Sequence, residues 1–274
     1  MSGGSRYVYG KNSVKALLDT SPTKVFKVFL AEGLKPDKRV QAIQESARQA
    51  KIPVQVVPRQ KLDQMLRGQE AALAEANPDL PENREEGGIS HQGVMASVAP
   101  KTLLNLPALL QLCEARKATG KHPRLLMLDG VTDPRNFGAI LRVADAAGID
   151  GVIIPKQHSA GFGPAVSKTA SGAEETVAIA VVSNLNQGIQ QVKDAGFWVA
   201  GAANDTGAVD YHRQDYQMPL LLIMGSEGKG LASLVRKNCD FLVKIPMHGT
   251  VDSLNVATAT AILLFEMVKP QKKA

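Results

Sequence analysis

The stretch LLMLDGVTDPRNFGAILR, residues 125–142, decides the fold class of this chain. Its apolar run at 125–129 is typical of a buried strand, and a turn rich in Gly, Asp and Pro follows. A helical pattern then extends over about 136–147 and stops at Gly148. Similar units repeat along the chain, with further strands expected at 151–154, 177–181, 197–200, 220–224 and 241–245. Because strands that alternate with helices pair in parallel, the sequence predicts an α/β fold with a mostly parallel sheet.

The chain is expected to divide near residue 100 into two α/β domains. Residues 1–98 form the smaller one, with short elements expected at 25–30, 36–50, 54–57, from Arg59 onward, and 91–98. An acidic segment rich in Ala, Glu, Asn and Pro, at about 68–88, is interpreted as a mobile surface insertion. A linker at 99–106 leads to the larger domain, 107–270, which starts with a helix at about 107–118 and ends with one at about 253–268.

Composition narrows the class of protein. The 274 residues are 44% hydrophobic and 21% charged, which is typical of a globular protein, and no apolar run reaches the length of a membrane span. The first residues lack the apolar stretch of a secretory signal, so a cytoplasmic location is expected. Cys113 and Cys239 lack metal-site spacing and lie in apolar surroundings, so both are interpreted as core residues.

The positive charge is concentrated near the start of the chain. The net charge is +6, and residues 1–61 hold 12 Lys and Arg against 4 Asp and Glu, whereas residues 62–100 hold 2 against 7. Both a phosphate-binding surface and an ordinary solvated face are consistent with this distribution. Aromatic residues make up 4% of the chain, which argues against base stacking. If RNA binds, the sequence favours recognition through shape and phosphate groups.

Several familiar sites are disfavoured by spacing. The glycines at 225, 228 and 230 match neither the P-loop nor the dinucleotide-binding pattern. The five histidines never fall at metal-ligand spacing, and no Gly-x-Ser-x-Gly elbow of a hydrolase is present. Each histidine is interpreted as a loop or surface residue, and His248 alone lies in a suspected site loop. A metal site is therefore not expected.

Three segments combine glycine and polar residues at expected strand ends, where open parallel sheets place their ligands. They are Asn136-Phe-Gly-x-x-x-Arg142, Gly225-Ser-Glu-Gly228, and Ile245-Pro-Met followed by Ser253-Leu-Asn255. Taken one at a time, each could be a turn or a helix cap; Asn136, for example, fits a helix start. In this order and spacing, the three segments resemble the SpoU (TrmH-type) RNA 2′-O-ribose methyltransferases over roughly residues 105–270.

The resemblance implies the fold and the cofactor. It implies an α/β knot of the SPOUT type, in which the C-terminal segment threads through a loop of the chain. Knots are rare, so periodicity alone would not predict one. The implied cofactor is S-adenosylmethionine, held by Gly225, Ile245 and Leu254, with glycine leaving room for the ligand and backbone groups reading the edge of the adenine.

The resemblance also implies a polar site. Its residues are Asn136, Arg142, Glu227, Ser253 and Asn255, and no metal is required. Because the sulfonium already activates the methyl group, the protein mainly aligns the donor and the acceptor and assists loss of the hydroxyl proton. The family assigns this help to the arginine, but a guanidinium keeps its proton in most settings. Stabilisation of the developing alkoxide, or of a nearby phosphate, is therefore an equally open role for Arg142.

The first hundred residues resemble, more weakly, the L30e-like substrate-binding domain that precedes this catalytic domain in ribosomal members of the family. The matching features are the entry Tyr9-Gly-Lys-Asn-Ser-Val-Lys-Ala-Leu-Leu18 and the closing His91-Gln-Gly-Val. The insertion at about 68–88 departs from the compact form of that domain. Family members are homodimers packed through the knot, which implies a homodimer here and an active site completed across subunits.

The expected function is transfer of a methyl group to a ribose 2′-hydroxyl of structured RNA, with a guanosine of 23S rRNA as the leading substrate because an additional N-terminal domain suits a folded ribosomal target. A tRNA is the alternative substrate. A non-catalytic RNA-binding or ribosome assembly factor is a different class that must also be considered. Retention of the set Asn136, Arg142, Glu227 and Ser253-Leu-Asn255 argues against it, since a pure binder needs none of these residues.

Overall fold

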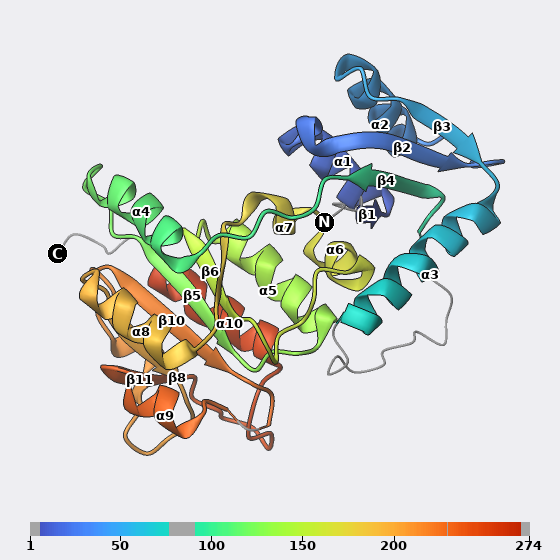
Figure 1. The fold of residues 1–274 in the computed structure, drawn as a ribbon. Helices are drawn as coiled ribbons and strands as arrows, with labels where there is room; N and C mark the ends of the chain where they lie inside the picture. Colours follow the sequence, from blue (N-terminus) through green and yellow to red (C-terminus); the bar gives the residue numbers. More distant parts are fainter. Residues whose placement is uncertain (1–5, 77–90, 229, 270–274) are drawn as a thin grey trace. The chain divides into compact units, whose positions relative to one another are not determined.

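The computed structural model describes residues 6–76, 91–228 and 230–269 of the chain. The chain forms two compact units (Figure 1). The first comprises residues 1–102 together with 161–176, and the second comprises residues 103–160 and 177–274. The segment 161–176, which the sequence analysis assigned to the larger domain, therefore packs with the N-terminal residues. No helix in the described part of the chain has the length and apolar character to cross a membrane.

The described residues of the first unit form a four-stranded sheet with the order β1-β4-β2-β3. Strand β4 pairs antiparallel with β1 and β2, while β2 and β3 are parallel. These strands are β1 (Arg6–Tyr9), β2 (Val25–Ala31), β3 (Val54–Val57) and β4 (Val94–Val98). The helical elements are α1 (Lys11–Thr20), η1 (Pro22–Lys24), α2 (Lys38–Gln49), α3 (Arg59–Ala76), α6 (Pro164–Ala170) and α7 (Ala173–Thr176).

Helices cover the sheet of the first unit on both faces. Apolar residues of α1 and α2, among them Leu17 and Ile43, form one core with alternate strand residues. Leu62 and Leu66 of α3 form a second core with Tyr9 and other residues of the opposite face. Helix α3 continues through the first nine residues of the expected insertion, because an Ala-rich sequence favours helix strongly enough to offset Gly68. The rest of that insertion lies largely outside the described residues.

A buried ionic cluster holds the segment 161–176 in the first unit. Arg6 is 8% exposed and pairs with Glu175, and its guanidinium lies 3.9 Å from the fully buried Glu174. The hydroxyl group of Ser13 donates a hydrogen bond of 3.1 Å to the carbonyl oxygen of Ser167. Charges that far from water require such partners, so the cluster fixes the segment against β1 and α1.

The described residues of the second unit form a parallel seven-stranded sheet with the order β7-β6-β5-β10-β8-β11-β9, which confirms the expected α/β class. The strands are β5 (Arg124–Asp129), β6 (Gly151–Pro155), β7 (Ile179–Val182), β8 (Trp198–Ala202), β9 (Val209–Asp210), β10 (Leu220–Gly225) and β11 (Phe241–Lys244). The helical elements are α4 (Leu106–Lys117), α5 (Pro134–Ala146), α8 (Leu185–Asp194), η2 (Tyr211–Arg213), α9 (Ser233–Lys237) and α10 (Val256–Met267).

Helices α4, α8 and α9 share one core with the sheet of the second unit, built around residues such as Leu109, Met127 and Ile223. Helices α5 and α10 pack against each other over the sheet (Figure 1). Each central strand is therefore buried on both sides, which explains its continuous apolar run. This arrangement leaves the loops at the carboxyl ends of the strands as the place where polar side chains gather.

Candidate active site

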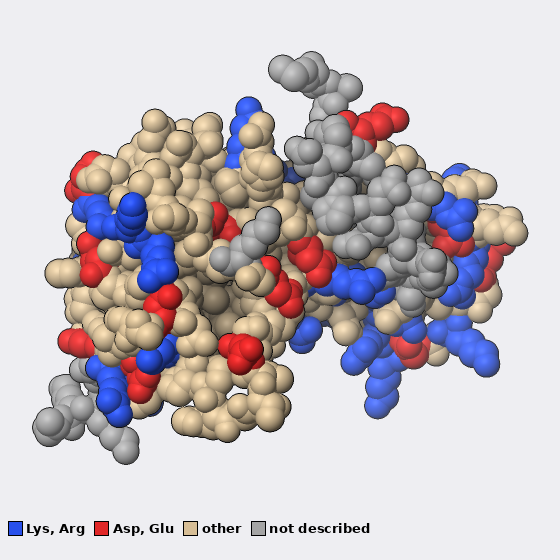
Figure 2. Space-filling model, turned by 90° about the horizontal axis from the view of Figure 1, so that it is seen from below, with Lys and Arg blue, Asp and Glu red and all other residues tan. Residues whose placement is uncertain are grey.

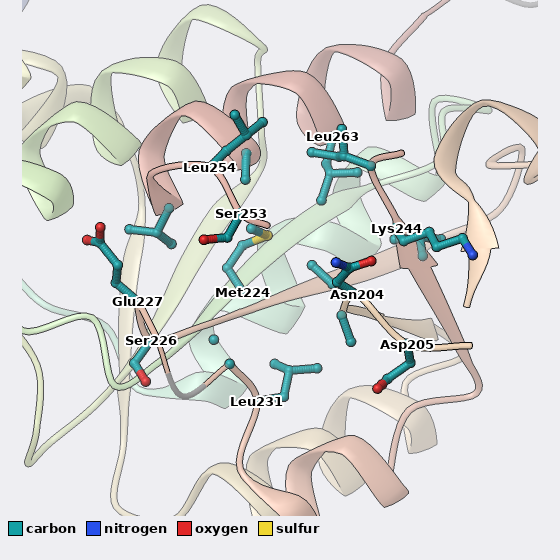
Figure 3. Close-up of a pocket in the computed structure, with 18 of the residues that line it drawn as sticks. Asn204, Asp205, Met224, Ser226, Glu227, Leu231, Lys244, Ser253, Leu254 and Leu263 are labelled. Carbon is teal, nitrogen blue, oxygen red and sulfur yellow. The ribbon is translucent and has the colours of Figure 1, made fainter. Parts of the chain in front are cut away.

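A cavity of about 510 Å³ lies where β8, β10 and β11 end in the second unit (Figure 3). Because these neighbouring strands are parallel, their carboxyl ends meet at one edge of the sheet. The loop that leads from β11 to α10 and the first turns of α10 complete the wall. Figure 2 shows a hollow in the second unit, with acidic side chains beside it.

The three residues expected to hold the cofactor, Gly225, Ile245 and Leu254, all line this cavity. They come from three separate segments: the end of β10, the residue after β11, and the loop before α10. Leu254 and Leu263 lie on one side of the cavity and Leu231 lies on the other (Figure 3). Much of the wall is thus apolar, which suits a flat heterocyclic ring.

Gly225 is required by the chain itself. The turn after β10 closes with two backbone hydrogen bonds between Ser226 and Gly230, of 3.1 and 2.9 Å, and folds back over Gly225. A Cβ atom on Gly225 would lie 2.2 Å from the carbonyl carbon of Gly230 and 2.4 Å from the amide nitrogen of Leu231. The expectation that this glycine leaves room for a ligand needs correction, since backbone atoms occupy the space beside its Cα.

A hydrogen-bonded chain joins residues of all three sequence segments. The side-chain amide of Asn255 donates to Oδ1 of Asn136 at 2.8 Å, and the amide of Asn136 donates to Oε2 of Glu227 at 3.2 Å. Glu227 and Ser253 line the cavity directly. Residues 91 and 119 positions apart thus meet at the cavity rim. These two hydrogen bonds fix the orientation of the Asn136 amide, whose oxygen accepts and whose nitrogen donates, and the Glu227 side chain stays exposed.

Asn136 is free for this contact because it is not the helix cap. The interpretation of Asn136 as a helix start is wrong: α5 begins at Pro134, and Asp133 caps it by accepting a hydrogen bond from the amide of Arg135. Proline at the first helical position fits this earlier start. The cap of α10, in contrast, is Asn255, whose Oδ1 accepts from the amides of Ala257 and Thr258. Asn255 therefore both starts a helix and orients Asn136.

Arg142 is not among the described residues that line the cavity. It lies on α5, six residues after Asn136, and its side chain is exposed. Arg142 does not line the cavity of its own chain within the described residues. Four of the five expected polar residues, Asn136, Glu227, Ser253 and Asn255, thus lie at the cavity or in its hydrogen-bonded rim.

Four polar residues of the described cavity wall lie outside the three sequence segments and were missed from the sequence. Asn204 and Asp205 follow β8, Lys244 ends β11 and Arg236 lies on α9. Arg236 Nη2 lies 2.7 Å from Asp205 Oδ2, and the Asn204 side-chain amide donates to the carbonyl oxygen of Asp252 at 3.3 Å. A signal was available for Asn204, Asp205 and Lys244, because polar residues at the end of an expected parallel strand belong to the ligand-binding edge, but not for Arg236, which lies on a helix.

The cysteines and one histidine add structural rather than chemical information. Burial raises the pKa of Cys113 to about 12 and that of Cys239 to about 11, so neither thiol is a nucleophile at neutral pH. His91 lies in the loop before β4, which agrees with its interpretation as a loop or surface residue, but its side chain is only 1% exposed. Its Nδ1 accepts a hydrogen bond of 2.9 Å from the amide of Gly93, and burial lowers the pKa of its imidazole.

Comparison with known proteins identifies the family. The description "SpoU rRNA Methylase family" matches residues 123–265, which is more than half of the chain. The chain belongs to the SpoU rRNA methylase family. A second description, "RNA 2′-O ribose methyltransferase substrate binding", matches residues 7–71. The resemblance inferred from the three sequence segments is confirmed.

Relatives of this family member align over nearly the whole chain. The 23S rRNA (guanosine-2′-O-)-methyltransferase RlmB of Pseudomonas aeruginosa is 40% identical, over 96% of this chain and 95% of that protein. Its Pseudomonas putida counterpart is 38% identical, over 97% and 96%. An AdoMet-bound rRNA methyltransferase from Sinorhizobium meliloti superposes with a TM-score of 0.67 at 26% identity, covering 96% of this chain and 86% of that one.

Proposed function

We propose that this SpoU family protein transfers the methyl group of S-adenosylmethionine to the ribose 2′-hydroxyl of a guanosine in 23S rRNA. Support comes from family membership and from two relatives of 38% and 40% identity that are named as 23S rRNA guanosine-2′-O-methyltransferases. One observation in the structure carries the proposal. Glu227, at the cavity wall, is hydrogen-bonded to Asn136, which is hydrogen-bonded to Asn255. A largely apolar cavity and a polar rim therefore lie together at one edge of the seven-stranded sheet.

The cavity fits S-adenosylmethionine in size and chemistry. Its volume of about 510 Å³ is within the usual range for a pocket that encloses a small ligand. Ile245, Leu254 and Leu263 offer apolar surface for adenine, and Asn204, Asp205 and Ser253 offer polar groups for the rest of the cofactor. When bound, the cofactor supplies a methyl group activated by its positively charged sulfur. The solved rRNA methyltransferase structure from Sinorhizobium meliloti, which is AdoMet-bound, supports this choice.

Residues of the chain would then position the acceptor ribose and assist the loss of its hydroxyl proton. Glu227 and Asn136 hold a fixed hydrogen-bonding pattern at the rim, which orients a ribose without a reorganisation cost at the moment of reaction. Ser253 lines the cavity next to the Asn255 cap and shapes the loop before α10. Arg142 would donate hydrogen bonds to the acceptor oxygen while the hydroxyl proton passes to solvent water, or it would donate to an adjacent phosphate.

The location of Arg142 supports an active site completed across subunits. In the described structure it is exposed and lies outside the cavity of its own chain. Helix α10 also carries Phe265, a large apolar side chain that is 51% exposed, which suits an interface between two copies. We therefore keep the homodimer, with Arg142 supplied by the partner, as part of the proposal. The cytoplasmic location stays a prediction.

The knot, the L30e-like domain and the division into residues 1–98, 99–106 and 107–270 stay predictions as well. The path of the chain supports the knot: it leaves β11 on the far side of β8, passes through residues 245–255, and enters α10, which packs against α5. Two helices flanking one face of a mixed four-stranded sheet support a compact RNA-binding domain at the start of the chain.

The reaction can be tested directly with labelled cofactor. We expect incubation with unmodified 23S rRNA, transcribed in vitro, to give label in an alkali-resistant dinucleotide that contains guanosine. Transfer RNA incubated in parallel is expected to remain unlabelled. Label on tRNA alone would replace the proposed substrate with the alternative one, and no label on any RNA, although the cofactor binds, would favour the non-catalytic RNA-binding or assembly factor.

Mixed dimers test the shared site. Arg142→Ala subunits and Gly225→Ala subunits should each be inactive alone. Heterodimers of the two should regain part of the wild-type rate, because one of their two sites would combine an intact cavity with an intact arginine. If the heterodimers stay inactive while the wild-type dimer is active, the arginine does not act across the interface.

A further inference from the structure

A second concave surface lies in the first unit. It is a groove of about 520 Å³ lined by Lys11, Asp37, Lys38, Arg39 and Gln92. In contrast to the cavity of the second unit, its wall consists of long polar and charged side chains. Residues 1–61 carry an excess of cations, but their sequence does not indicate where these side chains gather.

The groove is built where three segments converge at one end of the four-stranded sheet. Helix α1 starts directly after β1, the loop at 32–37 follows β2, and the turn at 91–93 precedes β4. Because β4 runs antiparallel to both β1 and β2, all three segments lie at the same end. The amide of Gly10 donates to the carbonyl oxygen of Val94 at 3.0 Å, which ties two of the segments together.

Gln92 locks the groove wall in a specific conformation. Its φ of 53° is in the left-handed region, which a residue other than glycine rarely adopts. In this conformation its Oε1 accepts a hydrogen bond of 3.1 Å from the amide of Lys11 at the start of α1. Strained backbone of this kind is held by the surrounding structure and is concentrated at functional surfaces. The groove is therefore a preformed feature of the fold.

The charges of the groove leave two cations available. Lys11 Nζ lies 2.6 Å from Asp37 Oδ2, and Asp37 Oδ1 also accepts from the amide of Val40. The acidic residue of the groove is thus already compensated. Lys38 and Arg39 are exposed and form no ion pair with any residue that the structure describes. They start α2, so their side chains stand at the groove, beside amides that also attract anions.

We infer that this groove binds the phosphate backbone of the RNA, with Lys38 and Arg39 as the groups that contact phosphate. The inference rests on the proposed function, which requires an RNA substrate. Two exposed cations that are adjacent in the chain can each contact one of two successive phosphates of an RNA strand. The guanidinium of arginine can bind one phosphate through two hydrogen bonds. The paucity of aromatic residues agrees with recognition that does not rely on base stacking. An acidic protein partner is the alternative occupant, and the experiment separates the two.

The test compares two double variants of the full-length protein. Lys38→Gln/Arg39→Gln removes the two cations at the groove. The matched control, Arg48→Gln/Lys51→Gln, removes two cations at the other end of the same helix, where Lys51 precedes β3 and Arg48 pairs with Glu45. Both variants change the net charge by the same amount. Binding to unmodified 23S rRNA is measured without cofactor over a range of salt concentrations.

We expect the groove variant to bind RNA about tenfold more weakly near physiological salt, because each lost phosphate contact removes a share of counterion release. The slope of log affinity against log salt should fall by about 1 for each of the two residues. The control should match the wild type in both quantities. Equal weakening in both variants would show a general charge effect and overturn the inference. Wild-type RNA affinity in the groove variant would overturn it too, and would leave an acidic protein as the occupant.

A third variant separates the effect of the groove's charge from that of a change in the groove's shape. Asp37→Asn keeps a side chain that can cap α2 while removing the one negative charge of the groove. RNA affinity should stay the same or increase, up to about threefold. A loss as large as that of the groove variant would show that groove shape, rather than cationic charge, explains the effect, and would count against phosphate binding.

Failure of this inference is distinguishable from failure of the proposed function. Methyl transfer by the wild type tests the function, whereas cofactor-free RNA binding tests the groove. If the wild type methylates RNA and the groove variant binds RNA normally, the inference alone fails. If the groove variant loses RNA binding but the wild type transfers no methyl group, the proposed function fails and the groove assignment stands.

Discussion

The cavity of the second unit lies at the carboxyl ends of parallel strands, and the groove of the first unit lies where β1 and β2 end and β4 begins, but the two surfaces are built from different kinds of side chain. The cavity is made of backbone turns and branched apolar side chains around Gly225, and it encloses about 510 Å³. The groove is made of long charged side chains such as Lys38 and Arg39. A small cofactor needs a shaped enclosure, whereas a polyanion needs charge spread along a surface.

This difference sets how each surface responds to change. Backbone atoms cannot move aside for one added methyl group without altering the turn, so the cavity should fail abruptly. Lysine and arginine on a surface contribute separately and are screened by salt, so the groove should weaken by increments. Substitutions therefore test whether the two surfaces are independent and differ in this way.

The largest effect is expected from Gly225→Ala. The new Cβ would lie 2.2 Å from the backbone of Gly230, so the turn after β10 must shift and the cavity must lose its shape. We expect cofactor binding below detection by calorimetry and methyl transfer reduced by about 10³-fold or more. RNA binding without cofactor should remain, because the groove is untouched.

Gly207→Ala is the matched control for this change. A Cβ at Gly207 meets no atom of a described residue within 4 Å, and its backbone is not in the left-handed region. It should therefore bind cofactor as the wild type does. Normal cofactor affinity in Gly225→Ala would show that the backbone does not fill the space beside this residue. A loss of RNA affinity in the same variant would show that the cavity and the groove are not independent.

The next largest effect is expected from Arg142→Ala. The proposed role of the guanidinium is at the acceptor oxygen, so the rate of methyl transfer should fall by about 10²- to 10³-fold. Cofactor affinity should not change, because the described wall of the cavity does not include this residue. Single-turnover kinetics with saturating RNA and cofactor give the rate. An unchanged rate would reject the assigned role.

Asn255 allows helix capping and site orientation to be separated. Asn255→Asp keeps an oxygen for the amides of Ala257 and Thr258 but loses the donor to Asn136. We expect stability within about 0.5 kcal/mol of the wild type and a rate about tenfold lower. Asn255→Ala should cost about 1 kcal/mol of unfolding free energy in addition. If Asn255→Asp keeps the full rate, the bond to Asn136 does not contribute to the reaction.

The smallest effect concerns pH and the groove wall. His91 is buried beside the groove turn and accepts a hydrogen bond from Gly93, and burial holds the pKa of its imidazole below the ordinary value. As the pH falls, His91 is therefore protonated first in the unfolded chain, where its pKa has the ordinary value of about 6.5. The stabilising contribution is complete above that pH and is lost as the pH falls toward the lower pKa of the folded state.

We expect the unfolding free energy of the wild type to fall more steeply between pH 7 and pH 5 than that of His91→Gln, which cannot titrate there. Denaturant unfolding at a series of pH values measures both. Cofactor affinity at the same pH values should follow the same course in the two proteins, since His91 lies in the other unit. If the unfolding free energies of the two proteins change in parallel with pH, the titration of His91 does not cause the pH dependence of stability.

Local sequence was a good guide to element type and a weaker guide to ends. The strand expected at 54–57 forms β3 with those bounds, and the strand expected at 220–224 extends by one residue as β10. The last helix was expected from Ser253, but α10 begins at Val256 because the side chain of Asn255 caps it. Strand β1 was missed: its sequence RYVY has one β-branched residue, whereas VQVV of β3 has three.

The candidate site divides in the same way. Gly225, Ile245 and Leu254 could be named from a resemblance, and all three do line one cavity. The pairing of Asp205 with Arg236 could not be predicted, because it depends on α9 lying beside the end of β8. The assignment of Asn136 as a cap failed because two acceptors compete at that turn, and Pro134 favours the earlier one, Asp133.

By itself, the sequence determined the α/β class, the order of the elements and the three segments that mark the family, because periodicity, turn residues and motif spacing act over short stretches of chain. Tertiary structure alone decided that Asn255, Asn136 and Glu227 form one hydrogen-bonded chain and that Arg6 holds the segment 161–176 in the first unit. Those contacts join residues about 90 to 170 positions apart. They depend on strand order and on the burial of charge, which no local pattern encodes.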